Sequence, residues 1–477
     1  MQLHTGTLSD PHRRTAITPD QRPTHRRYIL VGLVFLHTFN TYLDRVCISA
    51  AATDIQSDLS ISDQMMGHIF AVFAIGYALF QIPAGWVADR FGPRKALGSV
   101  VAVWSVFTCL SGAAFNAVSL LVIRFLFGIG EAGAFPGATR ALYAWLPARE
   151  RGIAQGIFHS GARVGAALSL LFLPALIVLI GWRWTFVFAG ATGIVWALAW
   201  VVWFRDDPAQ HPRVDEAELA LIRADQPAEN FASPDATPLW SILTSSNLLL
   251  AMFQYAASNV TFFISFTWLL PYLQNRWGPE AAPLAPVPLV FGMFAQWISG
   301  SLVSQLHRRG FPIASRRAPA MVGFAVSAVG LGLCLLAAPN SPWAFVLCFS
   351  VAVFGAEMTI SPSWAFCMDI GGRHTGAVSG AMNMVGNLGS AASAILFPWF
   401  IAHVTLPVVP GGSGSANSFF VFAAVLNLLA AGAWLGMNPL RTAAESSPGR
   451  ARLRVAIFIA LMAVVVALVV GTKLFRG

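Results

Sequence analysis

Charged residues are scarce in this chain. Asp, Glu, Lys and Arg together make up 11% of its 477 residues, whereas a soluble globular domain carries about 25%. Hydrophobic residues account for 56%, and apolar runs of about 20 residues, long enough to cross a hydrocarbon core of roughly 30 Å, recur along the whole length. The composition excludes a water-soluble fold and predicts an all-α membrane protein.

Cysteine is also sparse. All five cysteines fall in apolar runs and none has the spacing of metal ligands, so we interpret them as small apolar residues. We find no nucleophile–base pair and no nucleotide-binding loop in the sequence. We therefore expect no metal, no catalytic residues and no cofactor, and the chain is not predicted to be an enzyme.

Lysine is nearly absent, and arginine supplies almost all of the positive charge. The net charge of +9 would suit a nucleic-acid partner, but the arginines cluster in alternate loops, as membrane topology requires. The Arg-rich stretch 1–27 contains no apolar core of a signal peptide, so we expect a flexible cytoplasmic tail. These features predict a multi-pass protein of a bacterial inner membrane with a cytoplasmic N-terminus, whose macromolecular surroundings are the lipid bilayer and not nucleic acid.

Thirteen apolar runs qualify as transmembrane helices. They lie at about 28–50, 64–88, 96–116, 118–141, 152–178, 184–204, 246–273, 284–306, 318–337, 343–368, 375–403, 416–437 and 455–472. The last run follows a basic linker, 438–454, and we expect it to form an extra helix within 455–477.

A charged linker, 205–245, divides the first twelve runs equally. The expected domains are therefore two six-helix bundles, 28–204 and 246–437, around a site at the membrane midplane, which is a common plan among transporters. Within the linker, apolar residues at helical spacing over 214–224 predict an amphipathic helix on the cytoplasmic face.

Ionisable residues inside predicted spans are functional candidates, because charge is costly in a membrane. The first half contains five, namely Asp44, Arg45, Arg124, Glu131 and Arg163, and the second half adds Glu357, with Asp369 near a span end. An arginine suits a carboxylate ligand, and a carboxylate in a low-dielectric site can bind a proton reversibly. Together they would provide an anion site and a proton site. The alternative is a set of structural ion pairs that hold the helices together.

Spacing along the helix refines this expectation for two pairs. Arg124 and Glu131 are seven residues apart, or about 10.5 Å along one helix face, and are expected to line one cavity at different depths. Neighbouring Asp44 and Arg45 point about 100° apart on a helix, so only one of them is expected to face that cavity.

Three uncharged polar residues within spans are further candidates. Tyr77 would present a hydroxyl to the cavity. Asn383 and Asn387 are separated by one helical turn and share a face. Their amides could bind substrate hydroxyls or could pair with neighbouring helices.

A short basic loop over 85–95 reads Gly-Trp-Val-Ala-Asp-Arg-Phe-Gly-Pro-Arg-Lys. Its glycines allow close approach, and its acid could accept hydrogen bonds from basic groups or from a helix N-terminus. We interpret it as a conformational latch rather than a simple basic loop, with the candidate residues Gly85, Asp89, Arg90, Gly92 and Arg94. The corresponding stretch of the second half, 300–309, has Ser304 in place of the acid.

The loop resembles the signature loop of the major facilitator superfamily. Four further stretches resemble one branch of that superfamily, the anion:cation symporters. They are Tyr42-Leu-Asp-Arg45, Arg124 through Glu131-Ala-Gly-Ala-Phe-Pro136, Glu150-Arg-Gly152 and the loop Pro208…His211-Pro212…Glu216. That branch includes bacterial galactonate, glucarate and hexuronate transporters, and it is similar to the vesicular glutamate and sialic acid carriers. The resemblance covers about residues 28–440.

This resemblance implies proton-coupled import of an organic anion by alternating access, with the proton as the coupling ion. It assigns proton coupling to Asp44 and Glu131, the electrostatics of the site to Arg45 and Arg124, and substrate contact to Tyr77 and Asn387. We expect a monomer. Two alternatives remain: a proton-driven exporter of drugs or metabolites, whose cavity would be more apolar, and a non-transporting sensor of the same fold.

The chain departs from the family pattern in span 152–178. Sugar-acid members commonly have Gln where this chain has Ala162, and Arg163 follows it. The lost amide weakens the case for a polyhydroxylated substrate. The added cation fits a second carboxylate, as in a small aliphatic or aromatic dicarboxylate.

This departure predicts that Arg163→Ala impairs the binding of dianions more than that of monoanions. Competition assays with matched monocarboxylates and dicarboxylates measure the difference. An equal loss for both classes would contradict the assignment.

Overall fold

A computed structural model describes residues 23–224, 239–337, 341–404, 416–443, 452 and 454–456. These residues form helices and no strand, as predicted. The N-terminal half contains α1 (Arg26–Ala50), α2 (Ala52–Leu59), α3 (Asp63–Phe91), α4 (Pro93–Gly112), α5 (Ala117–Glu131), α6 (Ala134–Trp145) and α7 (Arg151–Trp203). Nine helices or continuous helical runs in the described part are long and apolar enough to cross a membrane.

The remaining helices follow the linker. They are η1 (Pro208–Gln210), α8 (Glu216–Arg223), α9 (Leu239–Leu243), α10 (Ser246–Thr267), α11 (Leu269–Trp277), η3 (Pro279–Leu284), α12 (Val287–Arg308), α13 (Pro312–Ala337), α14 (Pro342–Met358), α15 (Ile360–Gly371), η4 (Gly372–His374), α16 (Thr375–His403) and α17 (Asn417–Gly436). Most of the expected tail and nearly all of the expected thirteenth helix, 455–472, lie outside the described residues.

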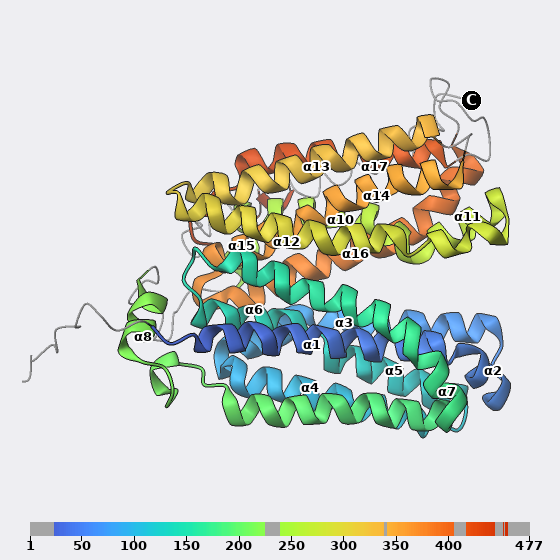
Figure 1. Cartoon of the computed structure of the whole chain (residues 1–477), viewed down its shortest axis with the longest axis horizontal. Coiled ribbons are helices and arrows are strands. Elements are labelled where there is room, and N and C mark those ends of the chain that lie inside the picture. Colours follow the sequence, from blue (N-terminus) through green and yellow to red (C-terminus); the bar gives the residue numbers. More distant parts are fainter. Residues whose placement is uncertain are drawn as a thin grey trace, which may run out of the picture.

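Two helical bundles lie side by side (Figure 1). One consists of α1–α7, where α7 packs on both α1 and α4; the other consists of α10–α17, where α13 packs on α14 and α10 packs on α16. The bundles meet chiefly where α7 contacts α12 and α3 contacts α16. Helix α8 forms within the expected segment 214–224 and lies at one end of the molecule, opposite α2 and α11.

Long helices are interrupted at specific residues. Helix α7 reverses direction at Gly181, whose φ of +79° suits glycine, so its two arms match the expected spans 152–178 and 184–204. The expected spans 118–141 and 343–368 are each broken, between α5 and α6 and between α14 and α15. Pro136 and Pro362 are each the third residue after the break, in a first helical turn, where proline is tolerated.

Glycines allow the bundles to touch at the α8 end. A Cβ atom on Gly85 of α3 would collide with the backbone of Gly376 on α16, and the reverse is also true. The same contact occurs between Gly300 of α12 and Gly152 of α7. Two similar seams therefore join the bundles, α3 with α16 and α7 with α12.

We expect Gly85→Leu to destabilise contact between the bundles at the α8 end, because overpacking a close contact costs about 1–3 kcal/mol. Such a cost reduces the population of the closed arrangement about 5- to 150-fold. Hydrogen exchange of the backbone over 81–94 and 148–160 should increase correspondingly.

Gly332→Leu is the matched control, since a Cβ there meets no atom within 4 Å. It should leave exchange in both segments unchanged. Unchanged exchange in Gly85→Leu would show that the seam does not hold this end closed.

Candidate functional site

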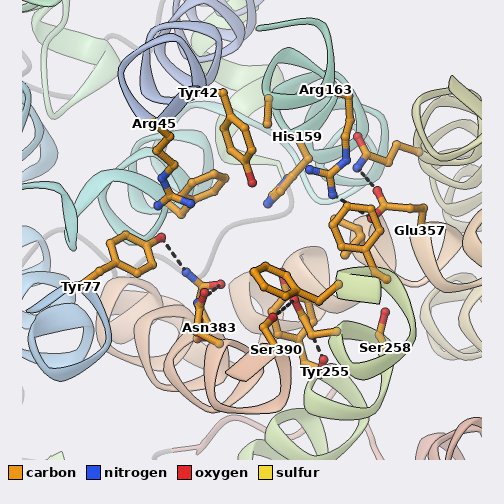
Figure 2. A pocket seen from close by; sticks show the side chains of 18 of the residues that line it. Tyr42, Arg45, Tyr77, His159, Arg163, Tyr255, Ser258, Glu357, Asn383 and Ser390 are labelled. Carbon is orange, nitrogen blue, oxygen red and sulfur yellow. Dashed lines mark hydrogen bonds and ion pairs between the residues drawn. The ribbon is translucent and has the colours of Figure 1, made fainter. Parts of the chain in front are cut away.

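A cavity of about 300 Å³ lies between the two bundles, within the size range of small-molecule sites. Both halves of the chain line it. Figure 2 shows Arg45 and Tyr77 on one side and Arg163 beside Glu357 on the other, with Asn383 facing Tyr77. Five of the predicted binding residues line this cavity: Arg45, Tyr77, Arg163, Asn383 and Asn387.

Arg45 forms an ion pair with Glu131. Its Nε and one terminal nitrogen lie 2.6 Å and 2.5 Å from Glu131 Oε1. The Arg45 side chain is 20% exposed and forms part of the cavity wall, whereas Glu131 is fully buried behind it. Glu131 Oε2 has no hydrogen-bond partner among the described residues. An anion entering the cavity would therefore meet the arginine first and would compete with Glu131 for it.

Asp44 and Arg124 lie behind the cavity wall. Asp44 Oδ2 accepts a 2.9 Å hydrogen bond from the Trp104 indole inside the N-terminal bundle. The Arg124 guanidinium packs on the rings of Phe127 and Phe73, 4.3 Å and 5.0 Å from their centroids. Phe73 itself lines the cavity.

The expectation that Arg124 and Glu131 line one cavity therefore differs from the structure. The cavity wall contains neither residue, because Phe73 covers Arg124 and Arg45 covers Glu131. As expected for neighbours on a helix, Arg45 faces the cavity and Asp44 faces the bundle interior.

Arg163 pairs with a glutamate of the other bundle. Its guanidinium lies 2.8 Å from Glu357 Oε1 and stacks on Phe262 at 4.1 Å. The other Glu357 oxygen accepts a hydrogen bond from the Gln296 amide. Sequence reasoning noted both charges but did not pair them. Arg163→Ala alone would leave the Glu357 carboxylate buried without a cation. A test of this variant must therefore include the double variant Arg163→Ala/Glu357→Gln, in which that carboxylate is also removed.

The predicted amides connect the two halves of the site. Asn383 donates a 3.2 Å hydrogen bond to the Tyr77 hydroxyl across the bundle interface. Asn387 donates to the Asn383 carbonyl oxygen at 2.8 Å. Both asparagines line the cavity and bond within the protein, so the arrangement is compatible with either role proposed from the sequence.

Aromatic rings from α6, α7 and α15 line one part of the cavity. His159 lies 4.7 Å from Trp364 and 5.4 Å from Phe135, measured between ring centroids. The Trp364 indole is held by a 3.0 Å hydrogen bond to the Tyr255 hydroxyl. His159 and Trp364 both line the cavity, and neither is among the candidates of the sequence analysis.

Several polar wall residues were not predicted. They are Tyr42, Ser49, Ser258, Asn259, Gln296 and Ser390. Their common signal is an uncharged polar side chain within an otherwise apolar helix, which also describes many residues that only pair between helices.

The predicted latch contacts the opposite bundle. Asp89 accepts 2.8 Å hydrogen bonds from the backbone N–H groups of Gly376 and Ala377 at the start of α16, where a helix N-terminus favours negative charge. Arg140 lies 3.5 Å from the same carboxylate. In the second half, Ser304 accepts a 3.0 Å hydrogen bond from the Ile153 N–H at the start of α7. The serine thus makes an uncharged counterpart of the aspartate contact.

The remaining latch residues stabilise the loop itself. Gly92 has a φ of +81° and approaches the Asp206 carboxylate, which accepts a 2.7 Å hydrogen bond from the Arg94 N–H. Burial raises the pKa of Asp206 above its ordinary value, although the Arg94 N–H opposes the shift. Arg90 lies over the rings of Trp86 and Phe91.

The family follows from the sequence match and the fold together. Residues 34–394 match the model of the Major Facilitator Superfamily. The chain belongs to this family. It is a multi-pass membrane transporter and not an enzyme, as predicted. The fold resembles that of a proton:xylose symporter of the same superfamily, with a TM-score of 0.65 and 14% identity over 88% of this chain and 98% of that one.

Curated relatives of the transporter are named for organic anions. A probable sulfoacetate transporter of Cupriavidus necator is 34% identical, over 87% of this chain and 95% of the relative. A probable galactarate/D-glucarate transporter of Bacillus subtilis is 30% identical, with 87% and 93% covered. A D-galactonate transporter of Escherichia coli is also 30% identical, with 85% and 94% covered.

A further ion-pair cluster joins the transporter's bundles at the α8 end. Asp369 of α15 lies 2.9 Å from Arg151 of α7 and 2.7 Å from Arg316 of α13. Arg27, at the start of α1, is paired with Glu150 at 2.8 Å and with Glu218 of α8 at 3.1 Å. Asp369 therefore links the two bundles at the α8 end, as the latch does, whereas the pairs of Arg27 hold α8 on the N-terminal bundle.

We expect Arg45→Met to destabilise the folded transporter strongly, because it leaves Glu131 buried without a cation. Breaking a buried pair in this way costs about 3–5 kcal/mol. The double variant Arg45→Met/Glu131→Gln should recover most of the loss. Thermal unfolding of purified protein measures both effects.

The matched control is Asp58→Asn, which disrupts an ion pair with Arg183 whose side chains are 49% and 42% exposed. Its effect should stay within about 1 kcal/mol. If the single and double Arg45 variants lose the same stability, the pair does not compensate a buried charge.

Proposed function

We propose that this transporter is a proton-coupled symporter that imports an organic anion by alternating access. The observation that carries the proposal is the cavity in which Arg45 and Arg163 stand on opposite sides, each in contact with a buried glutamate. Arginine binds carboxylates and sulfonates through directed hydrogen bonds. The names of the relatives support the same substrate class.

The substrate is a sugar acid such as galactonate, glucarate or a hexuronate, or a small aliphatic or aromatic carboxylate or dicarboxylate. Arg45 anchors the anion, and Tyr77, Asn383 and Asn387 donate to or accept from its hydroxyl groups. Arg124 acts from behind Phe73 through its charge. Arg163 supplies the second cation of the cavity.

Asp44 and Glu131 carry the coupling proton. Both are buried and both have one carboxylate oxygen without a hydrogen-bond partner among the described residues. When an anion takes Arg45, Glu131 loses its cation, and protonation is the least costly way to keep it in the membrane interior. One proton per monoanion is electroneutral, and each additional proton adds about 2.3 kcal/mol per 100 mV of membrane potential.

Alternating access uses the two bundles as rigid parts. The latch at Asp89 and the cluster at Asp369 hold the α8 end closed, and their release on one side accompanies closure on the other. We propose that the chain crosses a bacterial inner membrane twelve times in its two bundles and once more within 455–477. The N-terminus and the α8 end then face the cytoplasm. We propose that the transporter is a monomer and needs no cofactor besides the proton.

Proteoliposomes with an imposed pH gradient test this function. With galactonate, galactarate, glucarate, a hexuronate and sulfoacetate as probes, at least one anion should accumulate on the side that protons enter, and a protonophore should abolish the accumulation. Movement against the proton flow would indicate an exporter. Binding without flux would indicate a sensor.

Glu131→Gln provides the control for coupling. In the wild type, stabilisation by the anion should increase as the pH falls, because proton and anion bind together. With a monoanion such as galactonate, the variant should lose this pH dependence while it still binds the anion. A variant with the same pH dependence as the wild type would remove Glu131 from the coupling step.

A further inference from the structure

A buried glutamate precedes the break in the fourth long segment of each bundle. Glu131 ends α5, five residues before Pro136, and Glu357 lies at the end of α14, five residues before Pro362. The seams between the bundles repeat in the same way, with Gly85 and Gly376 matched by Gly300 and Gly152. Glu357 is therefore the structural counterpart of Glu131 in the second half.

The two glutamates have similar surroundings. Each contacts an arginine of the cavity wall, and each is more deeply buried than its arginine: Glu131 is 0% and Glu357 1% exposed, against 20% for Arg45 and 9% for Arg163. The difference lies in the origin of the cation. Arg45 belongs to the same bundle as Glu131, whereas Arg163 reaches Glu357 from the opposite bundle.

Few other groups face Glu357. From α12, Gln296 donates a hydrogen bond to it and Gly292 packs against its side chain. From α10, Tyr255 lines the same cavity as Glu357. Among the described residues its one ion pair is with Arg163. The negative charge of Glu357 in this buried position therefore depends on one cation.

A substrate anion on Arg163 would remove that compensation. A buried carboxylate without a cation is costly, and it becomes neutral by binding a proton. The proton comes from the aqueous phase, and the anion replaces the Glu357 carboxylate as the partner of Arg163. The charge around Arg163 is then unchanged, and the tie between the bundles at this position is released.

We propose that Glu357 is an additional proton-binding carboxylate besides Asp44 and Glu131, and that the substrate carries two anionic groups. One group replaces Glu131 on Arg45, and the other replaces Glu357 on Arg163. The inference rests on the proposed function and makes it more specific. It identifies the substrate class as a short dianion, such as an aldarate or a sulfonated carboxylate. A dianion enters with one more proton than a monoanion of the same size.

Calorimetry of the full-length transporter in nanodiscs tests the proposal without substitutions. The probes are galactarate and galactonate, which differ only in the second carboxylate, and sulfoacetate as an unrelated dianion. At pH 7 and above the free carboxyl groups are ionised. Titration in two buffers with different ionisation enthalpies counts the protons taken up on binding. Binding of galactarate or sulfoacetate should be accompanied by uptake of one more proton than binding of galactonate. The Kd of the dianion should therefore rise about tenfold more for each unit by which the pH increases.

Glu357→Gln assigns the additional proton. In this variant the proton uptake with a dianion should fall by one and equal that with galactonate. Glu131→Gln should lower the count for both probes. The exposed Glu280→Gln, in η3, is the matched control and should change neither.

The outcomes separate the two proposals. Equal proton uptake for galactarate and galactonate in the wild type, or an undiminished count in Glu357→Gln, would overturn the role of Glu357 and leave anion symport intact. Absence of binding by every anion tested would instead contradict the proposed function itself. Because the comparison in the wild type is decisive alone, poor folding of a variant leaves the inference testable.

Discussion

The need to compensate charge inside a membrane governs the arrangement of this site. Arg45 with Glu131 and Arg163 with Glu357 are ion pairs in which the acid is buried and the base faces a cavity. Each pair is stable only while its cation and its carboxylate stay together. A ligand anion that replaces the carboxylate of a pair therefore regains most of the interaction free energy between that carboxylate and the arginine. In the proposed mechanism, the binding of an anion and of a proton is linked in this way without contact between them.

Closure at the α8 end depends on a different constraint, which is close approach of backbones. Gly85 on Gly376 and Gly152 on Gly300 bring helices of the two bundles into direct contact. At that separation Asp89 reaches the first N–H groups of α16, and Ser304 reaches the start of α7. The hydrogen bonds of Asp89 and Ser304 are polar and local. In the proposed transport cycle they would be broken and remade as the bundles move.

The sequence was sufficient for the helical fold and for the charged part of the cavity wall, because both depend on local patterns. Apolar run lengths and arginine-rich loops identified the helices, and intramembrane charges identified Arg45, Arg163 and Glu357 of the wall. Polar residues within spans added Tyr77, Asn383 and Asn387. Arg124 shows the limit of this reasoning: helical spacing puts it on a face with Glu131, but only packing of Phe73 decides whether that face is open. The pair of Arg163 and Glu357 is separated by 194 residues, so no spacing rule could join them. The latch residue Asp89 was predicted as an acceptor for a helix N-terminus, although its partner helix was not.

The two ion pairs differ in what their exchange does to the protein. Replacement of Glu131 on Arg45 changes charge within one bundle and leaves the contact between bundles intact. Replacement of Glu357 on Arg163 removes a link between α7 and α14 and lies next to the seam of α7 with α12. The substrate itself would then restore that link only if it also contacts the C-terminal bundle. Asn383, Asn387 and Ser390 of α16 line the cavity and provide polar groups for such a contact. An anion that satisfies Arg45 alone would leave the Arg163 tie in place, so recognition at both ends and movement of the bundles depend on the same pair of charges.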